Sequence, residues 1–535
     1  MATRNLLRRV ATVGAAGAVG AAVAGAAGAG ALYASDRPMF HAYVRVGRCA
    51  VAASKIVLDY RATARASTDA SALAAAHARG GETLRAVCEA NGGVYIKIGQ
   101  HIALLDYLVP EPYLRALRPL FDCAPRTPYE RVREMLQLEL GAPVEALFAE
   151  FEREPIASAS LAQVHRARSL ADGRMLAVKV QHPPLQDMLR TEVGLLAALV
   201  RVVRLLEPSF GFEWLVDEVR LNLPLELDFR NEARNAEKCR ACLARRFGER
   251  VRVPRVHAQL SSARVLTMDF EAGTPASDAA SVRALGLDPR GVARLLGQVW
   301  GEMMFVSGWV HCDAHPGNIL VRTDGRGRVQ LVLLDHGLYR QIDDDLRAQW
   351  ARLWAAVVLS DESQIRRVTR ELGVHSRRME KLGSGLTFTL VAAMLTAKPY
   401  SAVASGSLDA LDVRALATDA AERAALASDV SKYGTAIIEV LESLPRPLLL
   451  LLKVNDALRS AGLRLGARPS DTYIVTALES LRALRGCSGS ARARHWATRP
   501  RAQFSLLRAR LRICTYLLAE WLADAWRAVL ARTSV

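Results

Sequence analysis

The stretch that decides the fold is "GWVHCDAHPGNILVRTDGRGRVQLVLLDHG", residues 308–337. Its first part places two histidines, a cysteine, an aspartate and an asparagine between His311 and Asn318, and apolar residues flank them. The apolar runs on either side of "DGRG" predict two strands of a hairpin. Taken alone, the first part is compatible with a metal site, a hydrolytic site or one portion of a larger constellation, so the remaining chain has to decide.

A lysine in an earlier strand favours the larger constellation. Lys179 lies in "LAVKVQ", the second strand of a hairpin with a "DG" turn; a lone strand lysine is usually a solvated side chain. Asp313, Asn318 five residues later and Asp335 seventeen residues after that complete the order typical of protein-kinase phosphoryl-transfer sites. The strand lysine would hold the nucleotide phosphates and Asp313 would orient or deprotonate the acceptor. Asn318 and Asp335 would ligate Mg²⁺, which prefers oxygen ligands.

With these parts in place, the sequence resembles the UbiB, or aarF-domain, family of atypical kinases. The motifs that carry the resemblance are "KIGQ" (97–100), "ASASLAQVH" (157–165), "VKVQHP" (178–183), "LELDFRNEARNAEK" (225–238), "HCDAHPGN" (311–318) and "DHG" (335–337). The match covers residues 85–345, and it is most similar to the mitochondrial aarF-domain-containing kinase 1 type.

This resemblance implies an α+β, protein-kinase-like two-lobe fold. It has a small β-rich N-lobe, a large helical C-lobe, a helical N-terminal extension with the KxGQ motif and a helical C-terminal extension. We place the boundaries as follows: a targeting or transmembrane segment at 1–35, the extension at 36–150, the N-lobe with its ExD insertion at 151–284, the C-lobe at 285–480, and a basic linker with an amphipathic helix at 481–535.

The resemblance also assigns roles to individual residues. Lys179 would contact the α- and β-phosphates of ATP or ADP and pair with Glu232, and Asp313 takes the catalytic-loop position. The expected nucleotide contacts are Ala157, Ser158, Ala159, Ser160, Leu161, Ala162, Gln163, Val164, Lys179 and Met268. Lys97 and Gln100 of KxGQ are expected across the site from Glu226 and Asp228 of ExD, in the groove where protein kinases place peptides. A small or lipid-like acceptor, or ATPase activity, is therefore expected rather than protein phosphorylation.

Two departures from ordinary kinases have physical consequences. Alanines replace the glycines of the phosphate-binding loop, and their Cβ atoms narrow the backbone conformations available, which should alter nucleotide preference and turnover. His336 stands where ordinary kinases have phenylalanine. We interpret it as a packed, hydrogen-bonded core residue; the alternative is that it tunes Asp335 with pH.

The two ends of the chain carry most of the net charge of +17. Residues 1–35 contribute +3 and residues 482–535 contribute +9, so the centre is close to an ordinary soluble domain, which argues against nucleic-acid binding. The acid-free, Arg-bearing start and the uncharged small-residue run at 10–34 predict mitochondrial targeting and one weakly apolar transmembrane helix. A cleaved transit peptide and a secretory signal are the alternatives. We expect an inner-membrane protein facing the intermembrane space and in contact with lipid.

Three further segments have a plain and a sharper interpretation. The last helix, 506–531, is either docked on the core or lies at a membrane interface. The run "LPRPLLLLLKVNDAL" predicts a buried helix rather than a span. Cys239 and Cys242 form a single CxxC, which favours thiols at a helix surface over a metal or redox site.

The sequence thus predicts a magnesium- and nucleotide-dependent atypical kinase or ATPase of mitochondrial membranes that supports lipid and coenzyme Q homeostasis. One alternative is a nucleotide-binding pseudokinase scaffold that performs no phosphotransfer. A hydrolase with a metal on His311, Asp313 and His315 is disfavoured, because it leaves Lys179 and Asp335 without a role.

Overall fold

The computed structural model describes residues 37–66, 69–103, 109–121, 126–183, 185–206, 213–313, 316–374, 391–393, 395–396, 440, 444–485 and 500–533. The targeting or transmembrane segment expected at 1–35 lies outside these residues, as does His315. No helix within the described ranges is long and apolar enough to cross a bilayer.

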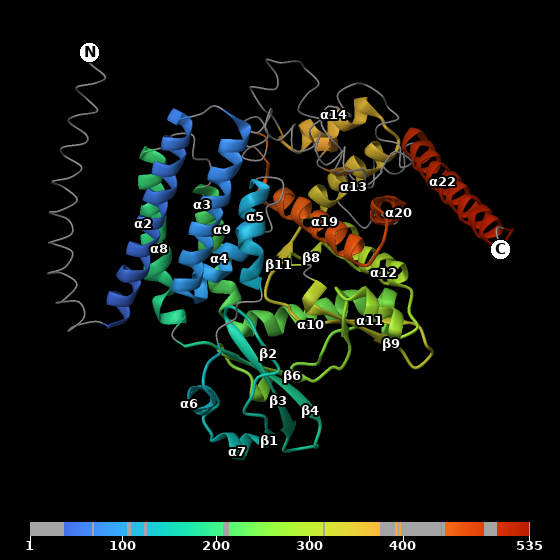
Figure 1. Ribbon diagram of the computed structural model, residues 1–535. Helices are drawn as coiled ribbons and strands as arrows, with labels where there is room; N and C mark the ends of the chain where they lie inside the picture. Colours follow the sequence, from blue (N-terminus) through green and yellow to red (C-terminus); the bar gives the residue numbers. More distant parts are fainter. Residues whose placement is uncertain are drawn as a thin grey trace, which may run out of the picture.

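A bundle of helices precedes and flanks the rest of the molecule (Figure 1). It contains α2 (Arg37–Ala66), α3 (Ala70–Asn91), α4 (Gly93–Ala103) and α5 (Glu111–Leu117), joined by α8 (Leu185–Leu206) and α9 (Glu213–Glu226) from later in the chain. The helices pack closely, because a Cβ on Gly81 of α3 would stand only 3.0 Å from the Cα of Tyr113 in α5. The bundle contains the first part of the extension expected at 36–150, with α8 and α9 added from the N-lobe sequence, whereas residues 129–150 of the expected extension pack with the small lobe.

The small lobe is an antiparallel sheet in the order β1-β3-β4-β6, with β2 on the edge of β3. Its strands are β1 (Phe148–Phe151), β2 (Ala157–Ser158), β3 (Ala162–Ser169), β4 (Met175–Gln181) and β6 (Val265–Asp269). The predicted hairpin is β3–β4, and Gly173 in its turn has a φ of 69°, a conformation that glycine adopts without strain. Helices α6 (Tyr129–Leu140) and α7 (Val144–Leu147) cover one face of this sheet.

The large lobe has a helical core with two small sheets at its edge. Its helices are α10 (Phe229–Phe247), α11 (Ala279–Ala284), α12 (Pro289–Gly301), α13 (Asp344–Val358), α14 (Glu362–Glu371), α19 (Arg446–Arg464) and α20 (Pro469–Arg485). One sheet has the strand order β5-β10-β9-β7, and the other pairs β11 with β8. The strands are β5 (Val251–Arg252), β7 (Thr274–Pro275), β8 (Trp309–His311), β9 (Ile319–Thr323), β10 (Val329–Leu333) and β11 (Tyr339–Gln341). The predicted "DGRG" hairpin is β9–β10, and the leucine-rich run is the buried helix α19.

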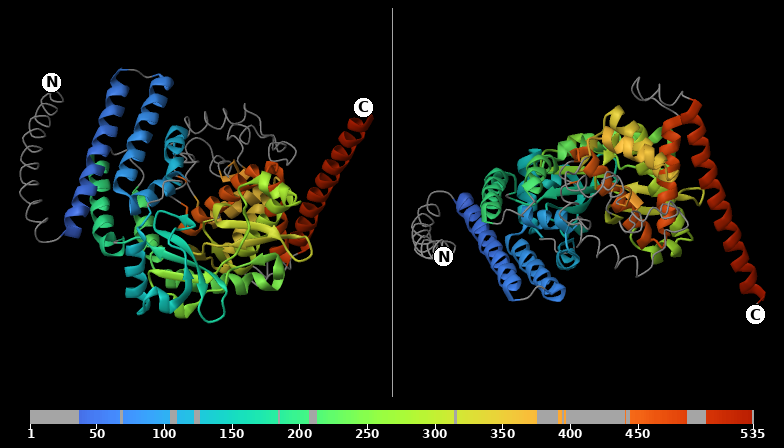
Figure 2. Two further views of the ribbon diagram at one scale, coloured as in Figure 1. Left: turned by 60° about the horizontal axis from the view of Figure 1, so that its bottom comes forward. Right: turned by 90° about the horizontal axis from the view of Figure 1, so that it is seen from above.

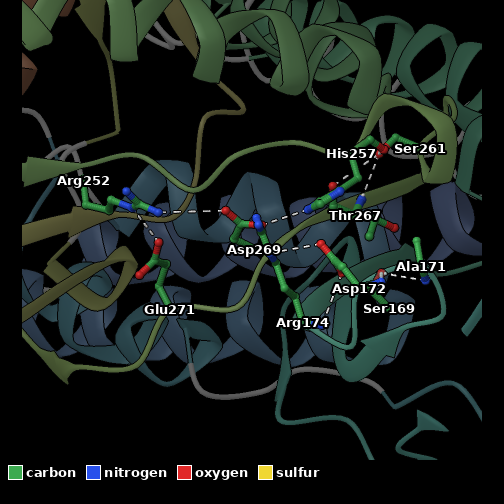
Figure 3. Close-up of polar contacts among 10 residues, drawn as sticks. All are labelled: Ser169, Ala171, Asp172, Arg174, Arg252, His257, Ser261, Thr267, Asp269 and Glu271. Carbon is green, nitrogen blue, oxygen red and sulfur yellow. Dashed lines mark hydrogen bonds and ion pairs between the residues drawn. The ribbon is translucent and has the colours of Figure 1, made fainter. Parts of the chain in front are cut away.

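The lobes are joined where β6 leads into β7, and charged residues line this hinge (Figure 3). Glu271 pairs with Arg252 of β5 at 2.8 Å and with Arg322 of β9 at 2.8 Å. Asp269 at the end of β6 accepts a hydrogen bond from His257 at 2.9 Å. Small-lobe and large-lobe strands therefore share one ion-pair network at the hinge, and the architecture is the predicted two-lobe kinase-like fold.

The last helix, α22 (Pro500–Thr533), extends away from the large lobe (Figure 2). Leu506, Ala509 and Ile513 are buried against the core. The opposite stripe is exposed, with Leu511 at 55% and Leu518 at 58%. The helix is therefore docked along one edge of its first half and also presents an apolar face to the outside.

Candidate functional site

The centre of the site is an ion pair between the two lobes. Lys179 lies on β4 between Val178 and Val180, whose side chains are buried under α6. Its ammonium group donates to both carboxylate oxygens of Glu232 on α10, at 2.8 and 2.9 Å. Asp228 caps α10, so Glu232 falls one turn into the helix on its buried stripe. The pair predicted from the sequence is therefore present.

Asp335 follows β10 and faces this pair. Its Oδ1 accepts the backbone N–H of Gly337 at 2.8 Å, and its Oδ2 accepts the amide of Asn318 at 3.4 Å. Burial alone would raise the pKa of Asp335, but the charges of Lys179 and Lys97 outweigh it and hold that pKa well below its usual range. Asp335 is therefore ionised at physiological pH and lies beside an amide, an oxygen-donor set that suits Mg²⁺.

His311 holds the catalytic loop against this aspartate. Its Nδ1 accepts the backbone N–H of Asp313 at 3.1 Å, which leaves its Nε2–H to donate to the carbonyl oxygen of Asp335 at 2.9 Å. Burial lowers the pKa of His311, which keeps the ring neutral. Both ring nitrogens are engaged, and the described residues contain no group of three His, Cys, Asp or Glu side chains placed to hold a metal. The hydrolase alternative also requires His315, which lies outside the described residues.

His336 is a core residue, as the sequence interpretation favoured. It is 2% exposed; its Nδ1 accepts the hydroxyl of Tyr339 at 2.9 Å, and its Nε2–H donates to the carbonyl oxygen of Leu333 at 3.0 Å. Burial, helped by the nearby His311, lowers the pKa of His336 to about 3. The imidazole is therefore neutral and fixes the turn after Asp335.

One residue of the KxGQ motif meets one residue of the ExD motif beside the site. Lys97 on α4 pairs with Glu226 at the end of α9, at 2.9 Å. Burial would lower the pKa of Lys97, but Glu226, Asp313 and Asp335 together raise it above its usual range. Lys97 is thus a second cation directed at the catalytic carboxylates. Asp228 does not join it, because its side chain caps α10 and pairs with Arg230 at 2.9 Å.

Gln100, the other residue of the KxGQ motif, connects the extension to the alanine-rich loop. Its amide donates to the carbonyl oxygen of Leu120 at 2.9 Å, and its side-chain oxygen accepts the hydroxyl of Ser160 at 3.4 Å. Leu161, at the next position of the loop, is buried against Val94 of α4 and Leu227 after α9. The loop expected to contact nucleotide is therefore also held by the helical bundle, which we call the cover.

The remaining expected nucleotide contacts line the small lobe. Ala157 and Ser158 form β2, Ala162 and Met268 pack together on the inner face of the sheet, and the N–H of Ala159 closes the loop on Ala162 at 2.8 Å. Val164 pairs with Lys179 across β3 and β4. The side chain of Gln163 instead binds the backbone of Thr127 at 2.7 and 3.0 Å, so it serves the small lobe rather than the site.

One residue of the site carried no assigned role in the sequence. Asn235 lies three positions after Glu232 on α10 and donates to the carbonyl oxygen of His336 at 2.9 Å. It therefore fixes the "DHG" loop from the same helix that presents Glu232. The helical spacing of i and i+3 places the two side chains on one face, and that spacing was the available signal.

The CxxC pair is not part of the site. Cys239 is buried in the large-lobe core, where burial raises the pKa of its thiol to about 12, and Cys242 on the next turn is half-buried. A protonated thiol in an apolar core is a poor nucleophile and metal ligand. Both thiols lie on α10, but the expected surface position is wrong for Cys239, which is buried because it faces the large-lobe core.

Comparisons with known proteins identify the family. Residues 119–369 match the family model described as the ABC1 atypical kinase-like domain. The chain is 40% identical over 433 residues to the AarF domain-containing protein kinase 1 of Gallus gallus, covering 80% of each protein. It is 39% identical to that of Xenopus tropicalis, covering 86% of this chain and 84% of the relative. A solved complex of Rv3197 with erythromycin, from Mycobacterium tuberculosis, aligns over 71% of this chain and 91% of that one, with 22% identity and a TM-score of 0.46.

Proposed function

This chain belongs to the AarF-domain family of ABC1 atypical kinases, and from that membership and the geometry of its site we propose that it binds an adenine nucleotide with Mg²⁺ and acts as an atypical kinase or ATPase. The observation that carries the proposal is the preformed pairing of Lys179 with Glu232 beside the ionised Asp335. In protein kinases the same three groups hold the nucleotide phosphates and the metal. Asn318 and Asp335 would hold Mg²⁺, which neutralises the negative charge on the phosphates.

The test is nucleotide-dependent stabilisation of the full chain. Ligand that binds only the folded state raises the melting temperature in proportion to its binding free energy. We expect Mg·ATP or Mg·ADP to stabilise the wild type and to leave Lys179→Ala and Asp335→Asn unchanged. Asp172→Asn, a change in the exposed β3–β4 turn, is the matched control and should respond like the wild type. Equal stabilisation of all four proteins would refute the proposal.

We further propose that the acceptor is a small or lipid-like molecule, or water. Asp313, which takes the catalytic-loop position, lies close enough to Lys97 of the helical extension for its charge to raise the pKa of that lysine. The α4 and α9 helices that carry the Lys97–Glu226 pair also bury part of the alanine-rich loop. Nucleotide turnover followed with and without anionic membranes, with labelled phosphate traced into co-purifying lipids, tests this. Transfer to an added peptide at rates above lipid and water would contradict it.

The same cover favours a second candidate, a nucleotide-binding scaffold without phosphotransfer. A partly buried loop and a lysine close to Asp313 and Asp335 would limit access of an acceptor. The two candidates separate in a rescue experiment in cells that lack the protein. Rescue by Asp313→Asn as complete as that by the wild type would establish the scaffold, whereas loss of rescue by an Asp313→Asn protein that still responds to Mg·nucleotide would establish the enzyme.

We propose that the protein works at mitochondrial membranes, in lipid or quinone homeostasis. The support is the acid-free basic start of the sequence, the basic C-terminal end and the exposed apolar stripe of α22. Flotation with liposomes of phosphatidylglycerol or of phosphatidylcholine tests the last point. Leu511→Asp with Leu518→Asp should reduce binding to the anionic liposomes, and Leu138→Asp, at an exposed leucine of α6, should not. Unchanged flotation of the double variant would refute the role of α22.

A further inference from the structure

The helix that presents Glu232 is packed mainly on the large lobe. Phe229 and Ala233, in the first part of α10, pack in the apolar cluster of the small-lobe sheet, together with Ala177 and Leu266. The later buried positions of the helix belong to the large-lobe core: Ala236, Cys239, Leu243 and Phe247. Most of the apolar surface that fixes this helix is therefore on the lobe that carries Asp335.

Polar contacts along α10 are also made with the large lobe. Asn235 donates to the carbonyl oxygen of His336 at 2.9 Å. One turn later Lys238 donates to Gln341 on β11 at 3.0 Å and lies over the ring of Trp309 on β8 at 3.6 Å. A cation above an aromatic ring is attracted to its face. These contacts reach both strands of the β8–β11 pair. Strand β8 directly precedes the catalytic loop, and strand β11 follows the "DHG" turn.

The last turn of α10 is held by a four-residue ion cluster. Arg246 donates to Glu302 at 2.9 Å and, through both terminal nitrogens, to Glu479 of α20 at 2.6 Å. Arg482 completes the cluster by pairing with Glu479 at 2.8 Å and with Glu302. The side chains of Glu302 and Glu479 are 9% and 6% exposed, so their charges depend on these arginines.

The position of this cluster connects it to the catalytic loop. Glu302 begins the short π-helical segment Glu302–Ser307, which leads through Gly308 into β8 and Asp313. Glu479 reaches the cluster because α20 passes Gly301 so closely that a Cβ there would stand 2.5 Å from the Cγ of Glu479. Arg246 thus joins the glutamate helix to the segment that carries the catalytic aspartate.

In protein kinases the lysine–glutamate pair forms only when the equivalent helix is correctly placed, and that placement is commonly regulated. We propose that Arg246 is a positioning residue: by fixing α10 to the large lobe, it keeps Glu232 paired with Lys179 before any nucleotide arrives. The consequence for nucleotide affinity rests on the proposed function, whereas the fixed position of α10 does not.

A double-mutant cycle on Mg·ADP binding to the full chain tests whether Arg246 acts through Glu232. If two residues act independently, the fold-changes in affinity that their substitutions cause multiply. If they act through each other, the effect of one substitution depends on whether the other has been made. We expect Glu232→Gln to weaken binding about tenfold in the wild-type background and less than about twofold in an Arg246→Ala background. Equal factors in the two backgrounds would overturn the proposal. If Arg246→Ala does not fold, Arg246→Lys replaces it, because a lysine cannot reproduce the two-nitrogen contact with Glu479.

Hydrogen exchange on the nucleotide-free protein tests the position of the helix directly. Amides of residues 229–236 should exchange faster in the Arg246 variant and at the wild-type rate in Arg240→Ala, whose exposed arginine pairs only locally with Glu237. Unchanged exchange in the Arg246 variant would overturn the proposal. If the wild type binds no Mg·ADP, the proposed function fails, and this measurement still decides whether Arg246 fixes α10.

Discussion

Two buried lysine–glutamate pairs face the same aspartate, and they belong to different parts of the molecule. Lys179 contacts both oxygens of Glu232, at 2.8 and 2.9 Å, and joins a small-lobe strand to a helix packed on the large lobe. Lys97 contacts Glu226 at 2.9 Å and joins α4 to α9, two helices of the cover. Both lysines lower the pKa of Asp335.

The difference between the pairs separates two halves of the site. We propose that the half built by Lys179, Glu232 and Asp335, the nucleotide half, binds nucleotide, because it has the arrangement of a protein kinase. The other half contains Lys97 and Glu226 of the cover, and the charges of Asp313 and Asp335 raise the pKa of Lys97. We propose that this second half limits the access of an acceptor.

The largest effect should come from exchanging each lysine in turn. Lys179→Met removes the phosphate-binding cation and leaves Glu232 buried without its partner, so Mg·nucleotide stabilisation should be lost. Lys97→Met removes the cover pair with Glu226 and one of the two cations that lower the pKa of Asp335, but it leaves Lys179 in place, so nucleotide affinity should stay within about threefold. Calorimetric titration with Mg·ADP measures both. Similar losses in the two variants would show that the cover belongs to the nucleotide half.

We expect an effect of intermediate size on the pH dependence of the unfolding free energy, and this effect should differ between the nucleotide half and the cover. His336 has its pKa lowered to about 3, against 6.5 when exposed, so the unfolded state gains a proton below pH 6.5 and the folded state does not. Its contribution to stability is therefore full above pH 6.5 and falls as the pH drops toward 3, by about 1.4 kcal/mol per pH unit. His336→Phe should flatten the dependence of the unfolding free energy on pH between 6 and 4, as measured in urea.

The matched variant for this measurement lies in the cover. His77 of α3 is half-buried and hydrogen-bonded to Tyr60, and burial lowers its pKa as well. His77→Phe should flatten the pH dependence less than His336→Phe does, because the ring at position 77 is less removed from water. A larger change at position 77 would mean that acid sensitivity originates in the cover.

The sequence predicted the nucleotide half better than the cover, for a physical reason. Hairpin turns, strand alternation and the Asp313-to-Asn318 spacing are local patterns, and they placed β3–β4, β9–β10 and Asp335 correctly. The contacts of Gln100 with Ser160 and of Arg246 with Glu479 join residues 60 and 233 positions apart. Such ion pairs and hydrogen bonds follow from how whole helices pack, which periodicity along one segment does not report.

The smallest effect should distinguish the two carboxylates of the ExD motif. Glu226 belongs to the cover pair, but Asp228, two residues later, accepts the N–H of Arg230 and caps α10. Asp228→Ala should lower the unfolding free energy by about 1 kcal/mol, the usual contribution of an N-cap, and leave Mg·ADP affinity unchanged. Asp288→Ala, at the cap of α12, is the control and should have a similar effect on stability. If Asp228→Ala instead weakened Mg·ADP binding while Asp288→Ala did not, Asp228 would act with Lys179 and Asp335 in the nucleotide half, and the boundary drawn between the two pairs would have to move to include it.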